Sequence, residues 1–536
     1  NLLMYPDPQH PVPVTLAECE ELAPDEGAKN GWELAARFAS QMLPQIFRQN
    51  SPVLELILPP ENQQRLESLL AKLPAETFTA SDALGWVYQF WQANKKDKID
   101  ASEEKIGARE LPVVTQLFTE PYMVSFLLDN SLGAWWAARR LTEDDLKNAE
   151  SEAELRQKAS IPGVPLEYLR FVRDEETGNW IPAAGTFDAW PENLSKLKTL
   201  DPCCGSGHFL MSALLMLTPM RAELEGLSQR EACDAVLRDN LHGLELDQRC
   251  VEIAAFALAL TGWRYAGYRV LPKFNLACSG LTINADIKDW LVLAGEDRTL
   301  GFAMEQLYKQ FQYAPILGSL INPEVDFAKG SLFESKWDDI QALLSKALTK
   351  ITSDDALELG VVAQGIARAA EILTDRYELI VTNPPYLARG KQSDDLKEYI
   401  DFHYKAAKND LANVFLERCL KIAASGGVVQ FVMPQNWLFL ISYKSHREYL
   451  LKNMIWCSLS RLGMAAFEVM DWWAFNVILI TLMQAKPADN HRIYGLDVSK
   501  SRQPEEKAGL LREILSYFVT KNNSYRIQTQ LSPLMN

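Results

Sequence analysis

The sequence predicts a doubly wound, Rossmann-like α/β sheet preceded by an N-terminal helical domain. Between residues 106 and 490, short apolar runs alternate with amphipathic helical patterns, which is typical of parallel strands joined by crossover helices. One run leads through a glycine-containing loop into an apolar helix, as in open α/β sheets. The predicted strands lie at residues 196–202, 240–247, 273–280, 377–385, 427–434 and 475–483.

Residues 1–105 carry a helical pattern instead. Apolar residues recur at i, i+3 and i+4 in residues 30–47 and 60–73, and a Ser/Asp capping signal opens a further helix at residues 81–100. The sequence therefore divides into three parts and one insertion: a helical domain (1–105), an α/β domain (106–490) with a helical insertion (291–375), and a polar segment (491–536) that begins a C-terminal region.

Length and composition are typical of a multidomain globular protein. The chain has 536 residues, 48% of them hydrophobic, which allows about two to four domains with large cores. It contains no run of 18 apolar residues and no leader pattern, so we expect neither a membrane span nor a signal peptide. The eight cysteines form no CxxC pair and the six histidines are dispersed, so we expect no metal site, no disulfides and a cytoplasmic location. The first residue is not methionine and the chain ends abruptly, which suggests a part of a longer protein.

The net charge of −16 bears on the expected partners. Surfaces that bind nucleic acid are usually basic, and the average charge here is acidic. A local basic cleft is still compatible with this charge. We expect further basic surfaces that bind nucleic acid to lie on another segment of the protein or on a partner subunit.

The loop from Asp201 to Gly207 follows the first predicted strand. Gly205 and Gly207 allow the backbone to turn tightly and to approach a ligand, although a plain strand–helix turn would use the same residues. Asp201 would repel a pyrophosphate and attract a cationic amino-acid group, and Glu245 ends the next strand, where it can accept hydrogen bonds from a ribose. No third glycine follows, and the acidic residue comes far later than in dinucleotide-binding folds. S-adenosylmethionine therefore fits this pattern better than NAD.

The segment Asn383-Pro384-Pro385-Tyr386 follows another predicted strand. The two prolines restrict φ and remove two backbone donors, so the loop presents carbonyl oxygens rigidly. The Asn383 side-chain oxygen and the Pro384 carbonyl could each accept one N–H of an exocyclic amine such as N6 of adenine, which frees its lone pair to attack a methyl group. Tyr386 offers a flat face for stacking the base. The alternative is a strand terminator followed by a core tyrosine.

With these motifs in this order, the sequence resembles the γ-type N6-adenine DNA methyltransferases. Residues 116–133 look like that family's N-terminal cofactor motif, with Thr119 at the position that contacts the methionine end. The loop residues Asp201, Cys203, Gly205 and Gly207 match the glycine motif, Glu245 the ribose-binding acid and Asn383 to Tyr386 the catalytic loop. Residues 461–480 resemble the segment that stacks the flipped base, with Phe467 as the best match; an ordinary core phenylalanine is an equally open reading.

The resemblance covers residues 80 to 490 and extends to large phage-defence enzymes. Long insertions are similar to those of the BREX enzyme PglX and of the DISARM class 1 adenine methyltransferase, and the stretches 201–210 and 244–260 together favour the DISARM type. One departure concerns the cofactor's adenine, because Ser279 and Gly280 stand where many relatives carry an acidic residue. Ser279, a backbone group or Asp286 would then contact this adenine.

The resemblance implies a site-specific enzyme that methylates double-stranded DNA, with S-adenosylmethionine as cofactor, partner subunits of a defence system and a target-recognition region after residue 490. No PD…(D/E)xK nuclease motif is found, so we expect modification without cutting. Arg389 and Lys391 could reach phosphates beside the flipped base or belong to a solvated loop. The alternatives are a protein-glutamine or RNA amino-methyltransferase and a non-catalytic DNA-sensing subunit.

Overall fold

The structure is a computed structural model of the chain. It describes residues 3–5, 12–44, 46–47, 56, 58–74, 76–77, 82–102, 104–115, 117, 119–323, 354–468, 476–513 and 517–520. Within this part of the chain, no helix is long and apolar enough to cross a membrane. The eight cysteines are present as free thiols.

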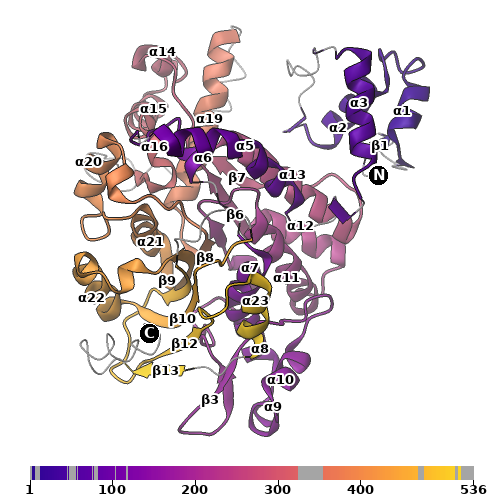
Figure 1. Ribbon diagram of the computed structural model, residues 1–536. Helices are drawn as coiled ribbons and strands as arrows, with labels where there is room; N and C mark the ends of the chain where they lie inside the picture. Colours follow the sequence, from indigo (N-terminus) through magenta and orange to yellow (C-terminus); the bar gives the residue numbers. More distant parts are fainter. Residues whose placement is uncertain are drawn as a thin grey trace.

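A nine-stranded, mostly parallel sheet forms the centre of the molecule (Figure 1). Its spatial order is β13-β12-β10-β11-β9-β8-β5-β6-β7. The strands are β5 (Thr199–Asp201), β6 (Leu241–Glu245), β7 (Asn275–Cys278), β8 (Tyr377–Thr382), β9 (Ala423–Pro434), β10 (Ile455–Gly463), β11 (Val477–Met483), β12 (Arg492–Asp497) and β13 (Tyr517–Thr520). Strands β7, β6, β5, β8 and β9 run parallel, whereas β11 is antiparallel to both of its neighbours. The predicted doubly wound α/β fold is therefore confirmed.

The strand order reverses between β5 and β8, which lie side by side with Leu200 opposite Ile380. The chain proceeds outward from β5 through β6 to β7 and then returns to place β8 on the other side of β5. In open α/β sheets, ligands bind at such a reversal, beyond the carboxyl ends of the strands. The loop after β5 and the loop after β8 therefore begin at the same point of the sheet edge.

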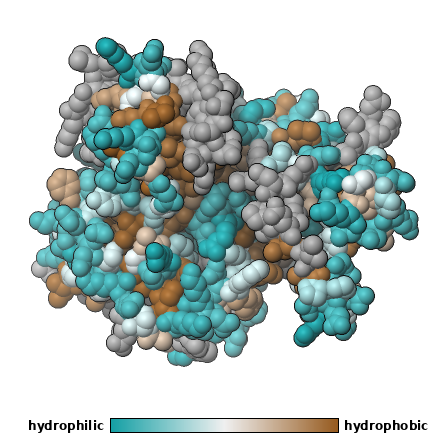
Figure 2. All heavy atoms as spheres, turned by 90° about the horizontal axis from the view of Figure 1, so that it is seen from above, coloured by the Kyte–Doolittle hydropathy of each residue, from teal (hydrophilic) through white to brown (hydrophobic). Residues whose placement is uncertain are grey.

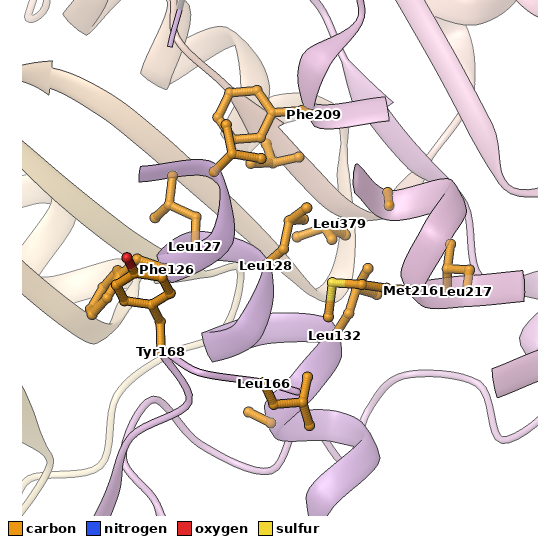
Figure 3. Packing of buried hydrophobic residues seen from close by; sticks show 14 of the residues in the cluster. Phe126, Leu127, Leu128, Leu132, Leu166, Tyr168, Phe209, Met216, Leu217 and Leu379 are labelled. Atoms are coloured by element: carbon orange, nitrogen blue, oxygen red, sulfur yellow. The ribbon is translucent and has the colours of Figure 1, made fainter. Parts of the chain in front are cut away.

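Both faces of the sheet are buried by helices. Along β8, Tyr377 and Ile380 belong to one hydrophobic cluster, whereas Leu379 and Val381 belong to the other. Residues 379 to 381 follow the alternation of side chains along a strand, whereas a register shift between Tyr377 and Leu379 places Tyr377 on the same side as Ile380. One face is covered by α15 (Arg298–Phe311), α19 (Asp354–Thr374) and α21 (Leu411–Ile422), and the other by α7 (Pro121–Leu128), α8 (Ala134–Arg140), α11 (His208–Glu225), α12 (Gln229–Asp239) and α13 (Gln248–Ala266). Figure 3 shows the second cluster, where Leu128, Met216 and Leu379 lie close together.

The N-terminal helices lie apart from the sheet in Figure 1, with the exception of α5. A short hairpin of β1 (Met4–Tyr5) and β2 (Val12–Pro13) accompanies α1 (Leu16–Leu22), α2 (Gly31–Met42) and α3 (Pro60–Ala71). Val14, Cys19, Leu34 and Phe38 form their own small core. By contrast, α5 (Ala83–Ser102) and α6 (Leu111–Val114) lie along the carboxyl edge of the sheet, beside α16 (Ala314–Leu317).

All six strands predicted from the sequence are present, whereas β10, β12 and β13 were not predicted. The pairing of β12 with β10 brings residues after 490 into the central sheet. The assignment of residues 491–536 to a further region stays a prediction, and residues 521–536 lie outside the described residues. The remaining described elements are β3 (Phe171–Arg173), β4 (Trp180–Pro182), α9 (Glu143–Asn148), α10 (Glu152–Ala159), α20 (Asp394–His403), α22 (Lys444–Asn453) and α23 (Pro504–Glu513), with short helical turns at η2 (Asp129–Gly133), η3 (Leu194–Lys196), η4 (Gly318–Leu320), η5 (Arg389–Lys391), η6 (Asn436–Leu438) and η7 (Ile441–Tyr443).

The connection between β7 and β8 contains helices, as the sequence predicted for residues 291–375. These are α14 (Ile287–Val292), α15, α16 and α19, and residues 324–353 of the predicted insertion lie outside the described part. Arg418 on α21 secures this connection, because its guanidinium donates to the carbonyls of Ile321 (2.8 Å) and Leu373 (3.0 Å). Only 1% of Arg418 is exposed, so water cannot replace these hydrogen bonds.

We expect Arg418→Met to lower the free energy of unfolding by about 2 to 4 kcal/mol, because two buried carbonyls lose their donor. Thermal unfolding followed by circular dichroism measures the effect. The control is Arg65→Met on α3, an exposed arginine whose loss should leave the melting temperature unchanged. Equal melting temperatures for both variants and the wild type would contradict the structural role of Arg418.

Candidate active site

A cavity lies at the carboxyl edge of the sheet, where the strand order reverses. Its empty space, including the open mouth, is about 870 Å³. Strand-end residues Asp201, Glu245, Ser279 and Asn383 line it, together with side chains of α6 and α16. Figure 2 views the molecule from above and shows hydrophobic side chains gathered in patches among hydrophilic ones. The cavity has the size and the mixed lining of a small-molecule site.

The glycine loop turns at this edge as predicted. Gly205 and Gly207 have φ angles of +52° and +88°, in the left-handed region that L side chains rarely adopt. A Cβ atom on Gly207 would also lie 3.1 Å from the Cβ of Ala254 on α13. Gly207 therefore permits both the turn into α11 and the close approach of α13.

Two buried carboxyl groups line the cavity beside this loop. Asp201 is 1% exposed, and burial raises its pKa to about 7. Burial also raises the pKa of Glu245, whose two oxygens accept hydrogen bonds from the backbone N–H of Gly205 (2.9 Å) and Leu246 (2.7 Å). Glu245 thereby joins the glycine loop to the end of β6. A cationic ligand in this cavity would favour the ionised form of both acids.

The Asn383 side chain is held on both sides. Its Nδ2 donates to the carbonyl of Leu117 (3.1 Å), and its Oδ1 accepts from the hydroxyl of Tyr386 (2.6 Å). The donation to Leu117 assigns the orientation of the amide, because the reversed amide would set two oxygens against each other. The same Tyr386 hydroxyl also lies 3.0 Å from the carbonyl of Val432 on β9. Asn383 is thus oriented with its oxygen toward Tyr386 and with one lone pair left to accept a further hydrogen bond.

The backbone of Thr119 contacts a histidine that also lines the cavity. The imidazole Nδ1 of His208, at the start of α11, lies 3.1 Å from the carbonyl of Thr119. Burial lowers the pKa of His208 to about 4, so the ring is neutral at pH 7 and donates from Nδ1. Both residues line the cavity. The segment before α7 and the glycine loop are therefore joined.

Most residues predicted for the site meet at the cavity. The residues that line it are Thr119, Asp201, Cys203, Gly205, Glu245, Ser279, Asn383 and Pro385. Gly207, Pro384, Tyr386 and Phe467 are not among the lining residues. Tyr386 is 9% exposed and Phe467 7%, and Phe467 packs in a hydrophobic cluster, so a stacking role for either ring stays a prediction.

The structure also brings residues to the cavity that sequence reasoning did not select. They include Leu111, Pro112 and Thr115 before the motif that contains Thr119, Leu117 within it, and Ile316 to Leu320 of the connection between β7 and β8. Ser319 donates to the carbonyl of Pro202 (2.7 Å), and Gly318 has a φ of +49°. The glycine beside apolar residues was the only hint that the sequence offered for this segment. The sequence did not indicate that Ser319 would contact Pro202, which lies more than a hundred positions away in the chain.

Three further sequence expectations concern residues around the cavity. Ser279 lines it, with its N–H donating to the carbonyl of Glu245 (2.8 Å), whereas Asp286 precedes α14 and is not a lining residue. Arg389 forms an ion pair with Asp401, so it is engaged within the protein. Among the described residues, no group of three or more His, Cys, Asp or Glu side chains could hold a metal ion.

The polar groups around the cavity are mainly hydrogen-bond acceptors. Carboxyl groups, backbone carbonyls and an amide oxygen surround one cavity, so acceptors of hydrogen bonds predominate over cationic donors among the polar lining residues. Such a site suits a ligand with a positive charge and hydroxyl groups, next to a second molecule that offers N–H donors. It does not suit a phosphate, which the acids would repel.

Two protein-family models match the chain. Residues 239–463 match the model described as Eco57I restriction-modification methylase, and residues 183–270 match the DNA-methyltransferase domain of MmeI. Among solved structures, the DrdV–DNA complex aligns with 94% of this chain and 41% of its own, at 13% identity and a TM-score of 0.45.

Curated relatives extend the similarity over most of the chain. Adenine-specific methyltransferase BrxX of Escherichia coli (strain HS) is 27% identical over 449 residues, which cover 79% of this chain and 35% of the relative. Adenine-specific methyltransferase PglX of Lacticaseibacillus casei (strain Zhang) is 25% identical over 511 residues, covering 91% of this chain and 40% of the relative. The chain thus spans two fifths or less of the length of these relatives. The resemblance predicted from the motifs is confirmed: the chain is similar over most of its length to adenine-specific methyltransferases of the BrxX and PglX kind.

Proposed function

We propose that this chain is the catalytic part of a DNA methyltransferase that transfers a methyl group from S-adenosylmethionine to N6 of an adenine flipped out of double-stranded DNA. It would mark self DNA in a phage-defence or restriction-modification system in the cytoplasm. The observation that carries this proposal is that Asn383, Asp201 and Glu245 line one cavity. The similarity to adenine-specific methyltransferases supports the choice of base.

The residues fit the proposed cofactor. S-adenosylmethionine has a sulfonium, an α-ammonium and a ribose but no phosphate, and it supplies an electrophilic methyl group. Asp201 would hold the cationic amino-acid end, and Glu245, with its carboxylate joined to the glycine loop, would accept a ribose hydroxyl. Thr119, Cys203, Gly205 and Ser279 would complete the walls.

The loop after β8 would act on the adenine amine. The Asn383 oxygen and the Pro384 carbonyl would each accept one N–H of N6, which turns its lone pair toward the methyl carbon. As the new C–N bond forms, the S–C bond breaks and the sulfur leaves as a neutral thioether, and N6 then releases one proton to water. This is catalysis by positioning and electrostatic stabilisation, with no strong base.

Radiolabelled S-adenosylmethionine tests the proposal directly. The protein is incubated in parallel with unmethylated double-stranded DNA, RNA and a protein extract, and the labelled product is digested and identified. The proposal expects label in N6-methyladenine of DNA and none with Asn383→Ala. Label in RNA or in glutamine side chains would support the alternative amino-methyltransferases, and label in cytosine would overturn the base assignment. Cofactor binding with no transfer to any substrate would favour a DNA-sensing subunit.

The acidic net charge of −16 leads us to expect that other parts of the protein or partner subunits contribute to DNA affinity. The test therefore uses the longest natural form of the protein together with its genomic neighbours. We also propose that the protein acts with partner subunits and belongs to a DISARM or BREX defence system.

Tyr386 provides a second prediction within the proposed mechanism. We expect Tyr386→Phe to lower kcat about tenfold, because Asn383 loses the hydroxyl that orients its oxygen, a hydrogen bond worth about 1.4 kcal/mol. The Kd for S-adenosylmethionine should change less than twofold. Tyr449→Phe, on a tyrosine of α22 that is 51% exposed, is the matched control. An unchanged kcat in Tyr386→Phe would show that the hydroxyl does not orient Asn383.

A further inference from the structure

Helix α5 belongs to the N-terminal helical segment, yet its start reaches the glycine loop. The hydroxyl of Ser206 donates to Oδ2 of Asp82, the residue immediately before α5, at 2.6 Å. Asp82 is 6% exposed and Ser206 1%, so the hydrogen bond is shielded from water. Ser206 stands between the two positive-φ glycines and lines the cavity. Asp82 is not itself a lining residue, so its effect on the cavity passes through Ser206.

One and a half turns further along, α5 contacts the second strand-end loop. The hydroxyl of Tyr88 donates to Oδ2 of Asp247 at 2.8 Å. Asp247 lies two residues after Glu245, and its N–H donates to Glu245 Oε1 (3.2 Å). Arg249 pairs with Asp247 and lies over the Tyr88 ring. One helix therefore holds both loops that carry the acidic residues of the cavity.

The local sequence allows the Asp82 carboxyl group to occupy this place. Asp82 has a φ of +55°, a conformation that aspartate, asparagine and glycine tolerate better than other residues. A Cβ atom on Gly85 would lie about 2.6 Å from Cγ of Asp82, so only glycine at position 85 leaves room for the carboxyl group. Ser206, Asp82 and Gly85 thus form one contact that depends on all three residues.

We propose that α5 is a cofactor-positioning element, in which Asp82 positions the glycine loop through Ser206 and Tyr88 positions the end of β6 through Asp247. This inference rests on the proposed function, because it takes S-adenosylmethionine as the ligand. In that assignment, the glycine loop and Asp201 face the amino-acid end of the cofactor, whereas Glu245 faces the ribose. The two contacts of α5 consequently affect different ends of the same ligand.

Binding of two different ligands can distinguish the effect of the Asp82 contact from that of the Tyr88 contact. S-adenosylmethionine carries the amino-acid end, and 5′-methylthioadenosine keeps the adenosine and the sulfur but lacks that end. Asp82→Gly keeps the backbone relaxed at positive φ and removes the carboxyl group. We expect it to raise the Kd of S-adenosylmethionine about tenfold, because the buried hydrogen bond that holds Ser206 of the loop is lost. The Kd of 5′-methylthioadenosine should change less than twofold.

Further variants distinguish positioning from a general structural role. Asp82→Asn keeps an acceptor for Ser206 and should restore the wild-type Kd within threefold. Gly85→Ala displaces the Asp82 carboxyl group without removing it, so it should also weaken S-adenosylmethionine about tenfold. Tyr88→Phe should weaken both ligands to a similar degree, about threefold to tenfold. Asp97→Asn, an exposed aspartate on α5, is the matched control.

Isothermal titration calorimetry on the longest natural form of the protein measures these constants. If wild type binds neither ligand, the proposed cofactor is wrong. If wild type binds both, but Asp82→Gly and Gly85→Ala bind S-adenosylmethionine as wild type does, the proposed role of α5 is wrong. An equal loss of both ligands in Asp82→Gly and Gly85→Ala would also overturn it, because the contact would then stabilise the whole site.

Discussion

Replacing Asn383 with alanine is expected to lower the rate of methyl transfer to DNA by about 100- to 1000-fold, the usual effect of removing a polar group that stabilises a transition state. Asn383 lines the cavity, and its side-chain amide is oriented by Leu117 on one side and Tyr386 on the other. Without it, the amine of the flipped adenine keeps only the Pro384 carbonyl as acceptor. Single-turnover methylation, with cofactor and DNA both saturating, measures the chemical step.

The variants around Asn383 test whether the oxygen or the whole side chain matters. Asn383→Asp keeps an acceptor but sets a second oxygen against the Leu117 carbonyl, so an intermediate rate is expected. Asn453→Ala, at the end of α22, controls for the loss of an asparagine elsewhere and should leave the rate unchanged. The Kd for S-adenosylmethionine should rise no more than tenfold in Asn383→Ala. A rate within tenfold of wild type would contradict the proposed acceptor role.

The parts of the fold that follow from local pattern could be predicted. The apolar runs that became β5, β6, β8 and β9 are bounded by glycine, proline or charged residues, so both their type and their approximate ends are visible in the sequence. The site residues at the ends of these strands were also predictable, because the carboxyl edge of a parallel sheet gathers them. The positive φ angles of Gly205 and Gly207 agree with the tight turn predicted for the loop after β5.

The remaining walls of the cavity depend on contacts between distant parts of the chain. Ser319 reaches Pro202, and Asp82 reaches Ser206, across more than a hundred residues in each case. No periodicity or turn signal encodes such a pairing, because local signals do not say which distant residue a side chain will meet. Tyr386 illustrates the same limit: the stacking role proposed for its ring stays a prediction, and nothing in the sequence indicated that its hydroxyl donates to Asn383. Packing against β9 decides this orientation, and the loop sequence does not reveal it.

Replacing Asp201 with asparagine is expected to raise the Kd for S-adenosylmethionine about 30- to 100-fold at pH 8, because a buried carboxylate facing a cationic group is worth about 2 to 3 kcal/mol. Asparagine preserves the acceptor for the N–H of Cys203, which Asp201 Oδ1 accepts at 3.1 Å. The loss should therefore reflect the missing charge and not a collapsed loop. Glu33→Gln, on α2 of the N-terminal helices, is the matched charge control.

The affinity of the wild type for S-adenosylmethionine should also depend on pH. Burial raises the pKa of Asp201 to about 7, so the group is largely protonated at pH 5.5 and ionised at pH 8. A cationic ligand binds the ionised form better, so affinity should rise with pH up to about 7 and then level off. In Asp201→Asn this slope should shrink, with only Glu245 left to titrate in the cavity wall. Equal slopes in both proteins would contradict the assignment of the charge to Asp201.

The same substitution should stabilise the free protein. A carboxyl group with a folded pKa above its unfolded value binds more protons when folded, so stability falls as pH rises from about 4 to about 7. Since one pKa unit corresponds to about 1.4 kcal/mol, Asp201→Asn should raise the free energy of unfolding at pH 8 by about 4 kcal/mol and change it little at pH 4. Thermal unfolding at the two pH values, without cofactor, measures the difference. A variant that is more stable yet binds the cofactor poorly would show that the buried charge serves the ligand and not the fold, because only a cationic partner offsets the cost of burying it.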